Sequence, residues 1–103
     1  MLIRSVRMTF KHENVADFQQ IFNHSKKQIR SFPGCQHLEL HGDYNHPNVF
    51  ATYSIWEDQN ALDNYRNSEL FEKVWSKTKI LFEKQPIAFS SRLIEKVESE
   101  VNN

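Results

Sequence analysis

The sequence contains little cysteine, glycine or proline and carries no net charge. Its 103 residues include one cysteine, two glycines and three prolines, and 13 Lys and Arg residues balance 13 Asp and Glu residues. A single cysteine excludes an internal disulfide and favours the reducing cytoplasm. The balanced charge argues against nucleic-acid binding, which needs a basic surface. No apolar run is long enough for a membrane helix or a signal peptide, so we expect no membrane association.

Aromatic residues, in contrast to cysteine, glycine and proline, are abundant in the sequence. Eight Phe, three Tyr and two Trp residues make up 13% of the chain, and they predict a core or cavity with flat walls. The length suits one domain with a single core. We place this domain at residues 1–95 and assign residues 96–103 to a polar C-terminal tail.

The spacing of apolar residues predicts the order of secondary structure. A period of two favours strands over 2–11, 35–43, 49–56 and 87–94. Helical spacing follows Asn14, which we expect to be an N-cap, and continues to Pro33 and Gly34. A second helical region begins at an Asp58 cap, breaks at a new Ser68 cap and runs to Pro86. The order strand, helix, strand, strand, helix, strand is the split β-α-β-β-α-β arrangement of α+β ferredoxin-like domains with an antiparallel sheet.

The sheet of such a domain has one face without helices, and the sequence predicts that this face is apolar. The third strand alternates two sets of residues that both contain large apolar side chains, and Ile3 adds to the uncovered side of the first strand. An exposed apolar sheet favours an interface, so we expect a homodimer with the two sheets face to face. The alternative is that Phe50 and Trp56 are ordinary surface aromatics.

Three histidines and the cysteine lie close together in the sequence, between residues 31 and 58. His37, Glu39 and His41 share one face of a predicted strand, but His37 and His41 are about 13 Å apart along it, too far to bind one metal ion. We therefore expect no metal site. Cys35 follows the C-terminus of a helix, where the dipole disfavours a thiolate, and we interpret it as a small buried residue.

Several segments together resemble a known family. The segments are VRMTF in the first strand, FPGC after the first helix, and YSIWED followed by ALDNYRNSELF. From about Leu2 to Phe89 the chain resembles the antibiotic biosynthesis monooxygenase domain of the dimeric α/β-barrel superfamily. The resemblance implies a ferredoxin-like protomer, a dimer with back-to-back sheets, and a pocket between helices and sheet. Some members oxygenate polyketide aromatics or quinols without metal or flavin, others degrade haem, and others have no established reaction.

The chain departs from that family at several pocket positions. Leu70 stands where many members have a histidine, and Val6, Tyr65 and Trp75 stand where the haem-degrading branch has asparagine, tryptophan and histidine. Without an imidazole, haem iron has no axial ligand, and we expect no cofactor. The resemblance then implies a substrate pocket in which Tyr65 is the candidate catalytic hydroxyl, lined by Val6, Tyr53, Leu70, Phe71 and Trp75.

Two functions remain open from the sequence. The first is a small cofactor-independent monooxygenase that acts on an aromatic or quinone-like molecule, with Tyr65 holding the substrate anion. The second is a non-catalytic homodimer that binds a small apolar or aromatic ligand, because the histidine is missing at Leu70. Resemblance of fold alone does not fix a reaction, so whether the chain is an enzyme stays open.

Overall fold

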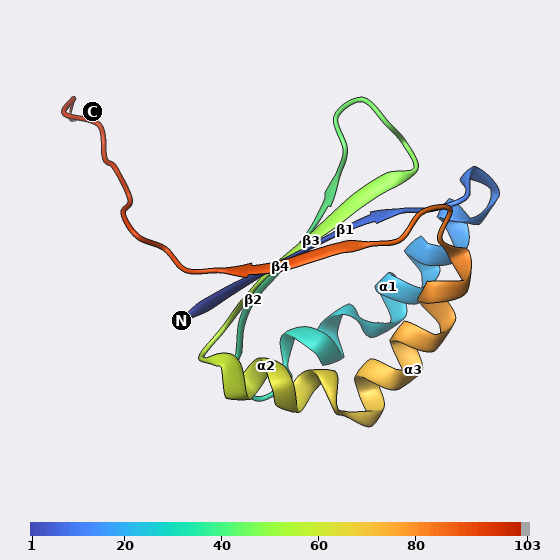
Figure 1. The fold of residues 1–103 in the computed structure, drawn as a ribbon, viewed down its shortest axis with the longest axis horizontal. Helices are drawn as coiled ribbons and strands as arrows, with labels where there is room; N and C mark the ends of the chain where they lie inside the picture. The colour runs from blue at the N-terminus through green and yellow to red at the C-terminus, as the bar shows by residue number, and fades with distance from the viewer. Residues whose placement is uncertain (102–103) are drawn as a thin grey trace.

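The computed structural model describes residues 1–101, which form one antiparallel sheet covered by helices on one side (Figure 1). The strands lie in the order β2-β3-β1-β4, and every neighbouring pair is antiparallel. This is the α+β ferredoxin-like fold that the sequence predicts. The strands are β1 (Leu2–Thr9), β2 (Cys35–Gly42), β3 (Val49–Trp56) and β4 (Ile87–Ser91), and the helices are α1 (Val15–Arg30), α2 (Gln59–Arg66) and α3 (Glu69–Thr78).

The start of α1 differs from the prediction. A 3₁₀ turn, η1 (His12–Asn14), precedes the helix, and the side chain of Asn14 caps no backbone group. Its amide instead donates a hydrogen bond of 2.9 Å to Asp17 Oδ2. The expected cap is therefore wrong, because the preceding turn gives Asn14 a backbone conformation outside the extended region that an N-cap needs.

The two caps predicted in the second helical region are confirmed. Asp58 Oδ1 accepts a hydrogen bond of 2.8 Å from the backbone N–H of Ala61, and Ser68 Oγ accepts one of 3.1 Å from that of Phe71. The Ser68 hydroxyl also donates to the carbonyl of Tyr65 at 2.6 Å. This one side chain thus joins the end of α2 to the start of α3 and sets the corner between them.

The last helix and the last strand are both shorter than predicted. After α3, the 3₁₀ turn η2 (Lys79–Leu81) leads into an extended Phe82, which bridges to Phe10. Strand β4 ends at Ser91 because its partner there is Ile3, close to the first residue of β1. Residues 92–101 contain no helix or strand and extend away from the sheet (Figure 1). The boundary proposed at residue 95 stays a prediction.

The core lies between the helices and the covered face of the sheet. One cluster of buried residues gathers around Phe10, and a second gathers around Trp56 beside α2. Phe50 and Trp56 are 9% and 1% exposed and belong to these clusters. The interpretation of them as surface aromatics is therefore wrong, because residues of β3 with their parity face the helices.

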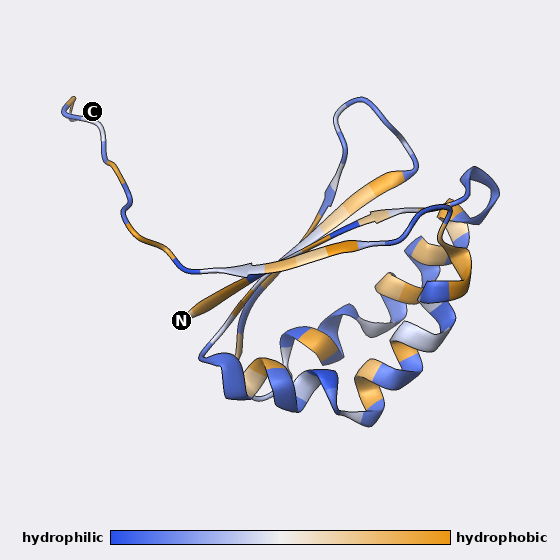
Figure 2. Ribbon diagram, viewed as in Figure 1, coloured by the Kyte–Doolittle hydropathy of each residue, from blue (hydrophilic) through white to orange (hydrophobic). Residues whose placement is uncertain are grey.

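The uncovered face of the sheet still carries large apolar side chains. Strand pairing places Ile3, Tyr53 and Phe89 on this face, since their neighbours in sequence point toward the helices. Phe89 is 53% exposed. Figure 2 colours stretches of β3 and β4 as hydrophobic. All three helices lie on the other side of the sheet (Figure 1), so no layer covers Ile3, Tyr53 and Phe89 within residues 1–101.

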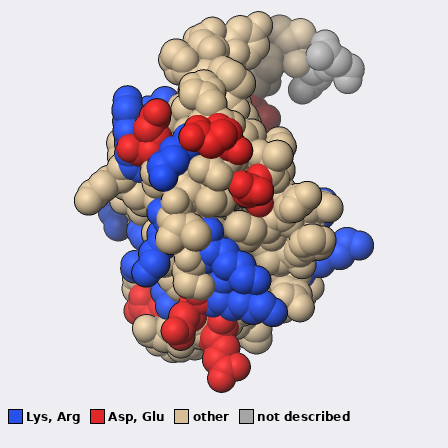
Figure 3. Space-filling view, turned by 90° about the vertical axis from the view of Figure 1, so that its right-hand side faces the viewer, with Lys and Arg blue, Asp and Glu red and all other residues tan. Residues whose placement is uncertain are grey.

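The surface charge is mixed. Figure 3 shows basic and acidic side chains on the same face of the molecule, as the zero net charge leads one to expect. Within residues 1–101 no helix combines the length and the apolar character needed to span a bilayer.

Candidate functional site

A cavity of about 260 Å³ lies between the helices and the covered face of the sheet. Strands β1 and β3 form its floor, α1 and α3 its walls, and the corner between α2 and α3 one end. The backbone of α1 lies against β2 and that of α2 against β3, whereas α3 contacts mainly α1 and α2. Side chains must therefore fill the space between α3 and the sheet, and they leave a hollow close to the lower size limit of small-molecule sites.

Aromatic rings form a continuous wall of the cavity. Trp56 stacks on Tyr65 with ring centroids 5.0 Å apart, Tyr65 meets Phe71 edge to face at 5.2 Å, and Phe71 stacks on Trp75 at 5.7 Å. These spacings are those of favourable aromatic pairs. The wall is pre-formed by contacts among its own members, so a flat ligand meets a surface that needs little rearrangement.

Tyr65 supplies the hydroxyl group of this wall. Burial raises the pKa of Tyr65 to about 12, and the nearby Cys35 contributes in the same direction. A phenol with this pKa is neutral at physiological pH. The hydroxyl donates no hydrogen bond to any group within residues 1–101. Tyr65 is thus suited to donate a hydrogen bond to a ligand and unsuited to act as a base.

Most other lining residues are apolar, and the polar exceptions come from the sheet and from the ends of α2 and α3. Trp56 Nε1 donates to Ser54 Oγ at 3.0 Å, and Ser54 Oγ donates to the carbonyl of Arg4 at 3.4 Å. Arg4 and Arg66 also line the cavity, and within residues 1–101 no carboxylate, amine or imidazole does. Sequence reasoning missed both arginines, although Arg4 has the same strand parity as the inward-facing Val6 and Met8.

The structure brings together four of the six residues that the sequence assigns to the pocket. Val6, Tyr65, Phe71 and Trp75 all line the cavity. Tyr53 does not, because its neighbours Thr52 and Ser54 point into the cavity and it must point to the opposite face. Leu70 is half-buried but is not part of the lining.

The histidine cluster lies on the uncovered face, away from the cavity. Both His37 Nε2 and His41 Nε2 contact the carboxylate of Glu39, and the ring of His41 stacks on Tyr53 at 6.1 Å. Hydrogen bonds from the two imidazoles hold the pKa of Glu39 below its usual value. Among residues 1–101 no three His, Cys, Asp or Glu side chains lie close enough to hold a metal ion.

Cys35 is buried at the start of β2, as expected from the sequence. Burial raises the pKa of its thiol, so the thiolate is scarce at neutral pH. The guanidinium of Arg30 donates to its backbone carbonyl at 2.9 Å, not to its sulfur. The side chain is part of the core beneath α2.

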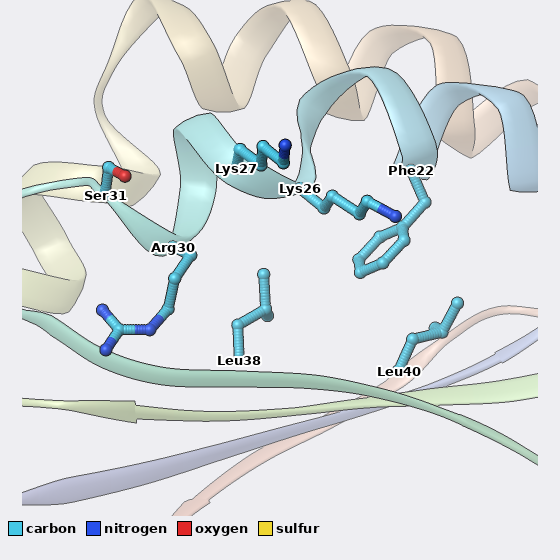
Figure 4. A pocket seen from close by; sticks show the side chains of 7 residues that line it. All are labelled: Phe22, Lys26, Lys27, Arg30, Ser31, Leu38 and Leu40. Atoms are coloured by element: carbon cyan, nitrogen blue, oxygen red, sulfur yellow. The ribbon is translucent and has the colours of Figure 1, made fainter.

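A second, more open depression lies between α1 and the edge strand β2 (Figure 4). Phe22 points from the helix toward Leu38 and Leu40 on the strand, and Lys26 and Arg30 border them. Phe22 and Leu38 also line the cavity. These two side chains therefore form the partition between the open groove and the enclosed site.

The comparisons with known proteins agree with the geometry. The family model described as antibiotic biosynthesis monooxygenase matches residues 1–75. No relative is found among curated proteins.

Solved structures superimpose over nearly the whole chain. A crystal structure described as an antibiotic biosynthesis monooxygenase matches with a TM-score of 0.87 and 19% identity, over 92% of this chain and all of that one. A conserved protein from Methanosarcina mazei Go1 gives 0.84 and 19% over 89% and 92% of the two chains, and a protein from Pseudomonas aeruginosa gives 0.82 and 18% over 91% and 94%. At these identities the structures establish the fold. Because the family model spans most of the chain, this protein belongs to the antibiotic biosynthesis monooxygenase family.

Proposed function

We propose that the protein is a cofactor-independent monooxygenase that acts on an aromatic or quinone-like small molecule in the cavity beneath α3. The observation that carries the proposal is the pre-formed aromatic wall around the neutral hydroxyl of Tyr65. Flat rings bind between such side chains, and the mostly apolar lining limits the access of water. Family membership supports the reaction class.

The proposed oxygenation requires few catalytic groups from the protein. An activated ring CH₂ reacts with O₂ to give a carbonyl and water, so the substrate supplies all four electrons that reduce O₂ and both hydrogens of the water. The substrate first loses a proton to form an enolate, and water at the mouth of the cavity takes up that proton, because no lining side chain within residues 1–101 accepts it. A preorganised hydrogen-bond donor stabilises that charge as it develops, and Tyr65 is the donor we assign to it. Phe71 and Trp75 hold the ring in place.

Oxygen consumption tests this function. Metal-stripped protein is given a panel of anthrones, naphthoquinols and flavonols, together with Tyr65→Phe and Tyr53→Phe variants. We expect uptake above the uncatalysed rate, a loss on the order of 10²-fold in Tyr65→Phe because one donor to the anion is removed, and no loss in Tyr53→Phe, whose hydroxyl lies on the other face. Equal rates for Tyr65→Phe and the wild type would contradict the assignment.

A second function is favoured by one observation: within residues 1–101 the cavity has no side chain that accepts a proton at neutral pH. A protein that binds or sequesters an aromatic molecule without oxidising it needs no such group. The two functions differ in the same assay, because a pure binding protein raises its melting temperature with these compounds and consumes no oxygen.

We also propose that the protein is a homodimer through the uncovered face of the sheet. Ile3, Ile55 and Phe89 give this face an apolar surface beside the polar His37–Glu39–His41 cluster. Arg7 and Asp43, whose charged atoms are 3.5 Å apart, add an ion pair at its border. Burying such a face against a second copy removes apolar area from water on both.

Light scattering on Phe89→Glu tests the dimer. We expect the wild type to have twice the chain mass at micromolar concentration and Phe89→Glu to have the mass of one chain, because a carboxylate cannot be buried there without a partner. Ile80→Glu is the matched control, since Ile80 is 68% exposed and lies on the helical side. A folded wild-type monomer would contradict the proposal.

We propose that the protein is located in the cytoplasm. Cys35 is a free and buried thiol, and proteins with such thiols are typical of reducing compartments. We place the protein there on this ground.

A further inference from the structure

Two arginines are the charged side chains that line the cavity within residues 1–101. Of its charged lining residues within residues 1–101, Arg4 comes from β1 and Arg66 from the last turn of α2. Neither guanidinium forms an ion pair with a carboxylate in the described part of the chain. The lining around them is otherwise neutral and mostly apolar, so within residues 1–101 no lining residue supplies a counterion to the two charges.

Arg4 and Arg66 line the same cavity, and their like charges repel each other. Burial lowers the pKa of Arg4, and the charge of Arg66 lowers it further. Arg66 is exposed and Arg4 is half-buried, so water screens part of this repulsion and the remainder acts at the mouth of the cavity. A ligand anion would remove this repulsion, and the free energy gained would contribute to its binding.

Arg4 is also held in position. Its Nη1 donates a hydrogen bond of 3.1 Å to Ser90 Oγ on β4, and a guanidinium has five N–H donors in a fixed plane. Within residues 1–101 the other donors of its side chain have no hydrogen-bond partner. Arginine pairs a carboxylate through two parallel hydrogen bonds, which a planar and oriented guanidinium forms best.

We infer that Arg4 and Arg66 form the anion-binding end of the cavity and that its ligand is an aromatic carboxylate. The aromatic body packs against the wall that contains Phe71 and Trp75, and the carboxylate is held by the two guanidinium groups. This inference rests on the proposed function, because it names the class of molecule that the same cavity binds. It adds a charge requirement that the aromatic wall by itself does not impose.

Calorimetric titration with 2-naphthoate and with its neutral methyl ester tests the inference. We expect the wild type to bind the acid about tenfold or more tightly than the ester, because hydrogen bonds to a charged group contribute more than neutral ones. Arg4→Gln and Arg66→Gln should each lose most of this preference and keep the affinity for the ester, which shows that the cavity is intact. Lys27→Gln removes the same charge outside the cavity and should keep the preference.

The outcomes separate this inference from the proposed function. If the wild type binds the ester as tightly as the acid, or if the preference for the acid survives in both arginine variants, the anion site is refuted and the aromatic cavity remains. If neither compound binds the wild type, the anion site is refuted, and the proposed function is then decided separately by oxygen consumption with the anthrones, naphthoquinols and flavonols.

Discussion

Replacement of Phe10 by alanine should lower the free energy of unfolding by about 3–5 kcal/mol, the usual cost of removing a fully buried phenylalanine. Phe10 is completely shielded from solvent. Its ring stacks on Phe18 with centroids 4.2 Å apart and on Phe82 at 5.2 Å. Its backbone N–H donates to the Asn48 carbonyl at 2.9 Å, so the residue joins the end of β1 to the start of β3 and to the segment after α3.

Urea denaturation of Phe10→Ala and of the wild type measures this loss. Tyr44→Ala is the matched control, because Tyr44 is 99% exposed and its removal should change the free energy of unfolding by less than about 0.5 kcal/mol. A loss below about 1 kcal/mol in Phe10→Ala would mean that the stacked cluster does not form the core.

Gly34→Ala should also destabilise the protein strongly. We expect its free energy of unfolding to fall by at least about 2 kcal/mol, because the added side chain causes both backbone strain and overpacking. Gly34 has a φ of 87°, and a Cβ built on it lies 2.4 Å from Ala61 Cβ. Its carbonyl accepts a hydrogen bond of 2.8 Å from the N–H of Glu57. A side chain at position 34 would therefore push α2 away from the start of β2.

Thermal and urea unfolding of Gly34→Ala can be compared with Gly42→Ala, where an added Cβ meets nothing within 4 Å. The control should stay within about 0.5 kcal/mol of the wild type. Because α2 positions Tyr65, we also expect Gly34→Ala to weaken the binding of aromatic ligands. Equal stability of the two alanine variants would show that α2 does not pack closely on Gly34.

The elements that the sequence predicts well are those set by local chemistry. Asp58 and Ser68 cap their helices as expected, because an N-cap depends on a few neighbouring residues. Asn14 fails as a cap because a 3₁₀ turn ahead of it, which periodicity does not reveal, changes its backbone. The end of β4 depends on where β1 begins, a pairing far apart in the sequence.

In the candidate site too, features that depend on distant parts of the chain are harder to predict from the sequence than local ones. Alternation along β3 separates two sets of side chains but does not say which set faces the helices. The sequence therefore does not distinguish Tyr53, which lies on the uncovered face, from Phe50 and Trp56, which are buried beneath the helices. Arg4 was missed for a different reason. A charged residue in the inward-facing set of β1 is the available signal, and it indicates an anion site only because the fold places Arg66 in the lining of the same cavity.

The most direct test of the cavity as a ligand site is intrinsic fluorescence. Both tryptophans of the chain, Trp56 and Trp75, line the cavity, and Trp56 is only 1% exposed. Anthrone, a flavonol and 2-naphthoate are titrated separately into the wild type and into Trp75→Phe. We expect saturable quenching by at least one compound, with residual quenching of Trp56 in the variant. Quenching that grows linearly with concentration for all three compounds would contradict the assignment of this cavity as the functional site.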